Sequence, residues 1–384
     1  MENILVVGAN TRPVACSLNR MGFNVYSADY FGCEDILACV KSHNSILSSK
    51  PFESKGLFSN EFTQDKLKNI SSEFIDIADH VICCSGADPQ NFPKNKIIGN
   101  KDVSHVENKY ELYKTLKKRF NGSFKVPDTF QVSDLEEASE VADMYPMKKF
   151  LIKPLQGSGG IGIRKLASED ISVGYNGMIL QEMVAGHDIS TSVVSNGDEA
   201  STILMSWQLI GKKNLGQLEE YGYCGNLAPY TGLNLKSEAK LKDISEEIIL
   251  ELGLVGSNGL DMIINDEEIY VIEVNPRLQG TFEVAESSLG INMAETHINA
   301  CNGTLKESTK PNTFALKMIV FAKARSIVGD IKQKGIHDRP TKNTIVEKGD
   351  PVATILSSGK ILENAIHNGK QLVDSVYSKL ERCK

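Results

Sequence analysis

Apolar and polar positions along the chain predict a mixed α/β protein. The chain opens with the apolar run Ile4 to Val7, a glycine turn, a helix-like stretch, and a second apolar run ending near Asp29. A strand, a helix and a second strand in this order begin a parallel α/β unit. The run 80–86 predicts a further central strand of the same unit. Three glycines at dinucleotide-binding spacing do not follow Gly8, which indicates a Rossmann-like shape without a nicotinamide cofactor.

The pattern changes after about residue 100. A helix is expected around 110–120, followed by two strands joined by a glycine-rich loop and by an α/β portion that ends in a hairpin. The tail has strand-like runs at 314–324 and 351–359 and a helix near 362–380. We therefore expect three parts. A Rossmann-like domain at 1–100 comes first, followed by a two-lobed domain at 101–305 with its small lobe at about 125–190. A small β-rich subdomain at 306–384 comes last.

Bulk properties exclude several classes of protein. At 384 residues the chain is too long for one compact core, and its net charge of −7 indicates neither nucleic acid nor an anionic membrane as a partner. No apolar stretch approaches the ~20 residues of a membrane span, and the N-terminus lacks the pattern of a secretory signal. Eight cysteines without a CxxC pair indicate reduced, mostly buried thiols in a cytoplasm.

The most informative segment is the predicted hairpin at 259–277. If its turn centres on Glu267, Asp261 lies opposite Glu273, and Asn275 shares their face. Two buried carboxylates are costly unless a cation offsets them, and oxygen ligands of this number suit Mg²⁺ that also binds substrate phosphates. Arg277 follows on the same face and is suited to holding a phosphate. The alternative is a solvent-facing hairpin edge with incidental acids.

A glycine-rich loop follows an apolar strand that ends at Lys153. A lysine and close-approaching backbone N–H groups are suited to phosphate oxygens, although the spacing is not that of a P-loop. The loop residues expected to contact the phosphates are Gly157, Ser158, Gly159 and Gly160. A flexible structural turn is the alternative for this segment.

A second loop follows the apolar strand that ends at 181–184. Backbone groups of Gln181, Glu182, Met183 and Val184 are suited to a purine edge, and Asp188 to ribose hydroxyls. Taken alone, this segment also fits an ordinary acidic turn between strands.

These motifs occur in the order found in the ATP-grasp superfamily, which the chain resembles in detail over about 100–300. More loosely, the whole chain resembles the biotin-carboxylase-like branch. The resemblance implies that Lys109 and Lys153 contact ATP phosphates, that 181–184 hold adenine, and that Asp188 binds the ribose. It also implies Mg²⁺, or Mn²⁺ in its place, on Asp261, Glu273 and Asn275, and a catalytic role for Arg277 and Lys153. For Lys109, a surface lysine at a helix start is the alternative.

The chain departs from the biotin carboxylase pattern after Gln279. Thr281 stands where the resemblance places a general base toward bicarbonate, and no biotin-attachment tripeptide occurs. The expected function is therefore a carboxylate–amine ligase that forms an acyl phosphate and releases ADP and phosphate. Alternatives are a bicarbonate-activating enzyme and a nucleotide-binding module without turnover. Glu283 is a candidate base, on the assumption that the strand continues; the alternative is an ordinary exposed acid.

The expected partners are a small-molecule carboxylate and a small-molecule amine as substrates. A homodimer is compatible with the sequence. Arg12 is either a carboxylate anchor or part of a surface salt bridge, and the segment 205–225 is a candidate wall of the substrate pocket.

Overall fold

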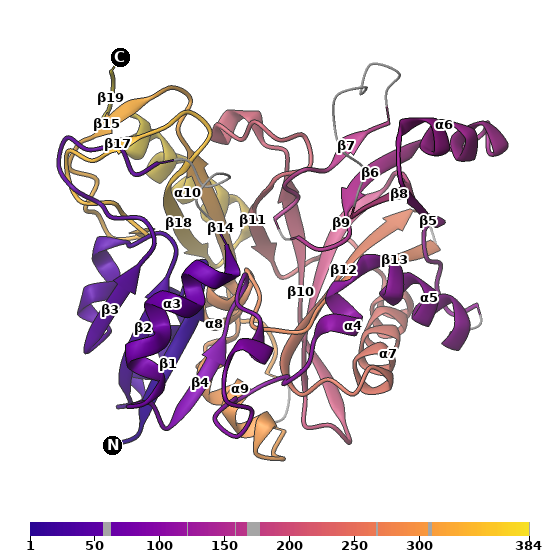
Figure 1. The fold of residues 1–384 in the computed structure, drawn as a ribbon, viewed down its shortest axis with the longest axis horizontal. Coiled ribbons are helices and arrows are strands. Elements are labelled where there is room, and N and C mark those ends of the chain that lie inside the picture. The colour runs from indigo at the N-terminus through magenta and orange to yellow at the C-terminus, as the bar shows by residue number, and fades with distance from the viewer. Residues whose placement is uncertain are drawn as a thin grey trace.

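The structure is a computed structural model that describes residues 1–56, 63–120, 122–157, 159–166, 177–265, 268–305 and 309–383. Figure 1 shows an N-terminal α/β unit, a small lobe that carries α6, and a large central sheet whose strands run between them. The C-terminal helix α10 lies beside the large sheet, close above the N-terminal unit. Within the described ranges, no helix is long and apolar enough to cross a membrane.

The N-terminal unit is a four-stranded parallel sheet in the order β3-β2-β1-β4. Its elements are β1 (Asn3–Gly8), α1 (Arg12–Arg20), β2 (Asn24–Asp29), β3 (Ser42–Ser45), α3 (Gln64–Ile75) and β4 (His80–Cys83). Ile4 to Val7 are fully buried, as a central parallel strand requires. Gly8 ends β1 where a Cβ atom would lie 2.7 Å from Cys84 Cβ, so a side chain there would clash with the neighbouring strand's end. The strands expected at 4–7 and within 80–86 are confirmed.

Short helices connect this unit to the small lobe. They are η2 (Pro89–Asn91), α4 (Ser104–Glu107) and α5 (Lys109–Arg119), whereas η1 (Glu34–Ala38) lies between β2 and β3 within the N-terminal unit. The side chain of Asn108 caps α5 by accepting from the N–H groups of Tyr110 and Glu111. The helix expected around 110–120 is therefore present, and Lys109 is its first residue.

The small lobe is a four-stranded sheet in the order β5-β8-β6-β7. Its elements are β5 (Thr129–Val132), α6 (Leu135–Met144), β6 (Phe150–Pro154), β7 (Arg164–Lys165) and β8 (Met178–Glu182). Phe150, Ile152 and Leu180 form its core with Ala138 of α6. This core holds Lys153 and Gln181 side by side on adjacent strands.

The large sheet has eight antiparallel strands in the order β13-β12-β9-β10-β11-β14-β18-β16. They are β9 (His187–Ser195), β10 (Ala200–Ile210), β11 (Tyr223–Ala228), β12 (Gly256–Asn265), β13 (Glu268–Asn275), β14 (Phe314–Phe321), β16 (Ile336–His337) and β18 (Pro351–Gly359). The elements packed on or beside it are η3 (Lys213–Leu215), α7 (Leu235–Glu251), α8 (Phe282–Leu289), α9 (Met293–Cys301) and α10 (Leu362–Tyr377). A three-stranded sheet of β15 (Ser326–Val328), β17 (Ile345–Val346) and β19 (Leu380–Arg382) completes the C-terminal part. The two strands predicted in the tail are thus β14 and β18 of the central sheet. The predicted helix is α10, which packs against them.

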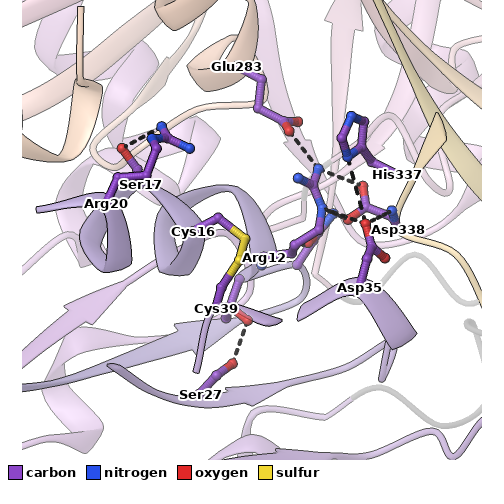
Figure 2. The surroundings of a disulfide bond; sticks show 12 residues. Arg12, Cys16, Ser17, Arg20, Ser27, Asp35, Cys39, Glu283, His337 and Asp338 are labelled. Carbon is purple, nitrogen blue, oxygen red and sulfur yellow. Dashed lines mark hydrogen bonds and ion pairs between the residues drawn. A yellow bond between two sulfur atoms is a disulfide. The ribbon is translucent and has the colours of Figure 1, made fainter. Parts of the chain in front are cut away.

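A disulfide joins Cys16 of α1 to Cys39, the residue that ends η1 (Figure 2). The expectation that all eight cysteines are reduced is wrong for this pair. The fold brings their Cα atoms to 4.8 Å, within bonding range, although 23 residues separate them in the sequence. No short spacing motif marks such a pair. The other six cysteines are free thiols.

Candidate active site

A β-bulge sets the pairing of two carboxylates in the hairpin β12–β13. The rungs next to the turn pair Asn265 with Glu268 and Met262 with Val271, so the hairpin is not centred on Glu267 as expected. The register then shifts, and Asp261 lies opposite Glu273. The predicted pairing is therefore correct, but the bulge rather than a symmetric turn produces it.

Polar neighbours surround this carboxylate pair. Asp261 accepts hydrogen bonds from Gln208 Nε2 at 2.8 Å and from Asn275 Nδ2 at 3.2 Å. Burial, and then the nearby Glu273, raise the pKa of Asp261 to about 6, while hydrogen bonds including those from Gln208 and Asn275 oppose the shift. At neutral pH Asp261 is therefore ionised in a site that disfavours the charged form, and a bound cation would offset this unfavourable energy. The alternative of a solvent-facing hairpin edge with incidental acids does not fit carboxylates that line a cavity, one of them bonded by Gln208 and Asn275.

The oxygen ligands of this site suit a hard divalent cation whose remaining ligands come from a bound substrate. In the described part of the chain, no three His, Cys, Asp or Glu side chains gather as ligands. Asp261 and Glu273 supply two carboxylates, and Asn275 supplies an amide oxygen. Oxygens from another molecule would have to complete the coordination of a metal ion. Mg²⁺ bound to substrate phosphates uses protein ligands in this way.

Two buried lysines face the same region. Lys109 is 8% exposed, and its Nζ lies 3.3 Å from Glu273 Oε1 and 3.2 Å from the Gly157 carbonyl oxygen. The alternative of a surface lysine is therefore wrong. Lys153 is 7% exposed, and its Nζ donates to Gln181 Oε1 at 2.6 Å. Burial is the main cause that lowers the pKa of Lys153 to about 8.

The glycine-rich loop closes over the segment that precedes β11. Gly159 and Gly160 adopt left-handed backbone conformations, with φ of +69° and +75°. The Gly159 carbonyl accepts from Tyr223 N at 2.9 Å, and a Cβ atom on Gly160 would lie 1.9 Å from the Tyr221 carbonyl oxygen. Only glycine permits this contact. Ser158, also expected to contact phosphates, lies outside the described residues.

The chain passes from the small lobe to the large sheet through 182–187. The Met183 N–H is occupied by the Lys149 carbonyl at 2.7 Å, and Glu182 Oε2 accepts from Lys148 Nζ at 2.9 Å. Val184 has no main-chain N–H bond to another described residue. Its N–H, like those of Ala185 and Gly186, is therefore a backbone donor at this passage that remains for a ligand. Burial raises the pKa of Asp188, which follows on β9.

Arg277 lies just beyond the end of β13. The strand stops at Asn275, so the prediction that Arg277 continues the same strand face is wrong. The chain instead turns, with Arg277 N donating to the Asn275 carbonyl at 2.9 Å. Its Nη2 donates to Asn275 Oδ1 at 2.8 Å, so the guanidinium still adjoins the proposed metal ligands.

Arg12 and Glu283 form a buried ion-pair cluster rather than surface features. Arg12 is 5% exposed; its Nε lies 2.5 Å from Asp338 Oδ1 and its Nη2 lies 2.6 Å from Glu283 Oε1. Figure 2 shows the Arg12 side chain between Glu283 and Asp338. Lys317 Nζ lies 3.2 Å from the other Glu283 oxygen. Burial alone would raise the pKa of Glu283, but Arg12 and Lys317 lower it overall. Of the two alternatives for Arg12, a carboxylate anchor or a surface salt bridge, the structure shows a salt bridge, but one that is buried rather than at the surface.

Residues 281–283 do not continue a strand. Glu283 belongs to the first turn of α8, so its expected facing as a strand residue is wrong, and it is buried rather than an exposed acid. Thr281 is 4% exposed, and its hydroxyl bonds to Ser192 Oγ at 2.9 Å and Gln279 Oε1 at 3.2 Å. Neither side chain is a free base at the cavity.

All these elements meet around one cavity of about 970 Å³. The predicted site residues that line it are Lys109, Lys153, Gly159, Gly160, Gln181, Glu182, Met183, Val184, Asp188, Asp261, Glu273, Asn275 and Arg277. Gly157 lies behind this lining, and the segment 205–225 contributes several wall residues, including Gln208 and Tyr223. Lys55 and Lys317 also line the cavity and were missed, because neither belongs to a motif.

Comparison with known proteins agrees with this arrangement. A family model described as the ATP-grasp domain matches residues 106–281. The uncharacterized protein MJ0776 of Methanocaldococcus jannaschii is 32% identical over 98% of this chain and 91% of its own length. The chain belongs to the ATP-grasp family. The tyramine–L-glutamate ligase of the same organism is 26% identical over 59% of this chain and 61% of that ligase.

Solved structures share the fold of this ATP-grasp chain. Biotin carboxylase of Campylobacter jejuni superposes with a TM-score of 0.73 over 99% of this chain and 91% of its own, at 16% identity. The N5-carboxyaminoimidazole ribonucleotide synthetase of Thermotoga maritima gives 0.67 over 99% of both chains, also at 16% identity. The expected α/β architecture with an ATP-grasp core is confirmed by these likenesses.

Proposed function

We propose that this chain is an ATP-dependent carboxylate–amine ligase that works through an acyl phosphate. The observation that carries the proposal is the pairing of Asp261 with Glu273, beside Asn275, in the same cavity as Lys109 and Lys153. Two partly buried carboxylates in one cavity with two buried lysines suit a phosphate chain with its bound cation. The cavity of about 970 Å³ lies at the upper end of the roughly 300–1,000 Å³ of typical ligand pockets, which fits ATP together with a second molecule.

ATP would lie between the small lobe and the large sheet. In this arrangement Val184 N–H and its neighbours hold the adenine, Asp188 accepts from the ribose, and Lys109 and Lys153 bind the phosphates together with the glycine-rich loop. Mg²⁺ on Asp261, Glu273 and Asn275 would neutralise charge on the phosphate oxygens. The contribution of the protein is to position ATP and to exclude water.

The reaction would proceed in two displacements. A carboxylate oxygen of the substrate attacks the γ-phosphorus of ATP, and the bond to the ADP oxygen breaks. The nitrogen of a neutral amine then attacks the acyl carbon, phosphate leaves, and the nitrogen releases a proton as the amide forms. Arg277, whose guanidinium adjoins Asn275, is placed to hold the phosphoryl group in both steps.

Two alternatives find less support. A bicarbonate-activating enzyme needs a base, but Thr281 is held in a closed hydroxyl–amide cluster and Glu283 is paired with Arg12 and Lys317. A nucleotide-binding module without turnover would not need two carboxylates held together at an electrostatic cost. Both observations favour a ligase that acts on small-molecule carboxylates and amines.

An ADP-release assay tests the proposal. Parent enzyme, Mg-ATP, and pools of carboxylates and amines are expected to release ADP only when both substrate classes are present. Glu273→Gln should lose this activity, whereas Glu268→Gln on the same strand should keep it, because Glu268 is an exposed partner of Lys125. Equal ADP release with bicarbonate alone, or release unaffected by Glu273→Gln, would overturn the proposal.

A further inference from the structure

Lys55 sits on a segment of the N-terminal unit that is fastened to the C-terminal part of the chain. Its N–H donates to the Ile345 carbonyl at 3.1 Å, and Ile345 N donates in turn to the Glu53 carbonyl at 3.0 Å. Phe52 N donates to the Asn343 carbonyl at 2.8 Å. Ser54 forms a parallel β-bridge with Ile345. The backbone that carries Lys55 is therefore held in place from both sides.

The side chain of Lys55 is buried and has no polar partner among the residues that the structure describes. It is 9% exposed and lines the cavity described above. No hydrogen bond or ion pair joins its Nζ to any residue in the described part of the chain. Lys55 and Cys33 line the same cavity. Burial and Asp338 raise the pKa of the Cys33 thiol, whereas Lys55 lowers this pKa, so the Lys55 ammonium is close enough to Cys33 to act on it electrostatically.

The other buried or half-buried cations of this cavity all have partners. Lys109 contacts Glu273, and Lys153 contacts Gln181. Lys317 contacts Glu283, and Arg277 contacts Asn275. Among the described residues, Lys55 is the buried cation of the cavity wall whose ammonium group has no hydrogen-bond or ion-pair partner. Burying an ammonium ion is costly unless an anion offsets it.

We propose that Lys55 binds an anionic group, a carboxylate or a phosphate, on one of the two substrates. The proposal rests on the proposed ligase function, and it adds that this substrate carries a negative charge besides the reacting carboxylate or amine. Phe31 and Cys33 line the same cavity as Lys55, so an aromatic ring and a thiol share this wall with the ammonium. In such surroundings the ammonium selects strongly for charge.

Isothermal titration calorimetry tests the subsite without turnover. Parent enzyme and variants are saturated with Mg²⁺ and a non-hydrolysable ATP analogue, so that the ATP phosphate sites are filled, and are titrated with inorganic phosphate and with glutarate. At least one probe should bind the parent, and Lys55→Met should weaken that binding by about tenfold or more. Lys55→Arg, which keeps the charge, should retain most of it. The probe that binds identifies the anion as phosphate or carboxylate.

Lys348→Met is the matched control, because Lys348 lines the same cavity but is exposed. It should leave probe binding within about twofold of the parent. The subsite is refuted if neither probe binds the parent, if Lys55→Met binds as tightly as the parent, or if Lys55→Met also loses the ATP analogue. These outcomes are independent of ADP release, so the subsite and the ligase function can fail separately.

Discussion

Asp261 of β12 lies directly opposite Glu273 of β13, and the pairing depends on one extra residue in β13. Met262 pairs with Val271, so Ile272 is the unpaired residue of the bulge. A regular hairpin would set Asp261 opposite Ile272 and would turn Glu273 to the other face of the sheet. The bulge therefore gathers both carboxylates at the cavity, as bulges next to active sites commonly do.

Removing one of these charges should abolish the cation-dependent chemistry. Glu273→Gln keeps the shape of the side chain, so we expect a folded protein whose Mg-dependent ADP formation falls by roughly a hundredfold or more. Steady-state ADP release of the parent, Glu273→Gln and the exposed control Glu268→Gln measures this. Turnover of Glu273→Gln within about threefold of the parent would show that Glu273 is not a metal ligand.

Asp261 should make the cation-free protein less stable as pH rises. Its pKa in the folded chain is about 6, above the ordinary value of 3.8, so the folded state holds the proton more tightly than the unfolded state. Stability should therefore fall between about pH 4 and pH 6 and stay reduced above that range. Asp261→Asn should remove this dependence and raise the free energy of unfolding at pH 7 by on the order of 1 kcal/mol. Urea denaturation with a chelator present, at several pH values, is the measurement; an unchanged pH slope would contradict it.

Lys153 should make nucleotide affinity pH-dependent. In the ligand-free protein its pKa is lowered to about 8, so the ammonium loses its proton as pH rises past that value. Phosphates prefer the charged form, so affinity for a non-hydrolysable ATP analogue should fall between about pH 7 and pH 9, by at most about tenfold per pH unit.

Two variants separate charge from geometry at this position. Lys153→Arg keeps its charge over the whole range, so its affinity should be independent of pH but below that of the parent at pH 7, because a planar fork does not replace a point charge. Lys153→Ala should bind weakly at every pH. Parent-like affinity of Lys153→Ala would show that the strand and its glycine-rich loop are structural only.

Arg12 should stabilise the junction between the N-terminal unit and the rest of the chain. Removing it leaves the carboxylates of Glu283 and Asp338 buried without their shared partner. We expect Arg12→Met to lower the free energy of unfolding by about 3–5 kcal/mol. Arg20→Met, which removes an exposed partner of Glu286 from the same helix, should cost less than about 1 kcal/mol. Equal effects of the two variants would contradict the assignment.

The elements that form the site were largely predictable, because each rests on local pattern. Two apolar runs on either side of an acidic turn marked the hairpin, and a strand ending in Lys153 before clustered glycines marked the phosphate loop. The role of the lysine at the start of α5 followed only from the resemblance to the ATP-grasp family, because a helix start by itself also fits a surface lysine. That these elements converge on one cavity was inferred from the order of the motifs, because no single segment of the sequence indicates it.

What escaped prediction depends on contacts between distant residues. Arg12 meets Asp338 across 326 residues, and the extension of the central sheet by β14 and β18 involves strands from the tail. Lys55 belongs to no motif, and only the folded chain reveals that it is buried. The Cys16–Cys39 bond likewise depends on how α1 and η1 pack.

Trapping with hydroxylamine tests the ligase assignment most directly, because hydroxylamine converts an acyl phosphate into a stable hydroxamate. With a carboxylate that supports ADP release, Mg-ATP and hydroxylamine, the parent should form hydroxamate in proportion to ADP, and Glu273→Gln should form none. Bicarbonate with free biotin should leave ADP release at background. Bicarbonate-dependent ADP release that rises with biotin, together with no hydroxamate from any carboxylate tested, would contradict the ligase and establish a carboxylase-like enzyme.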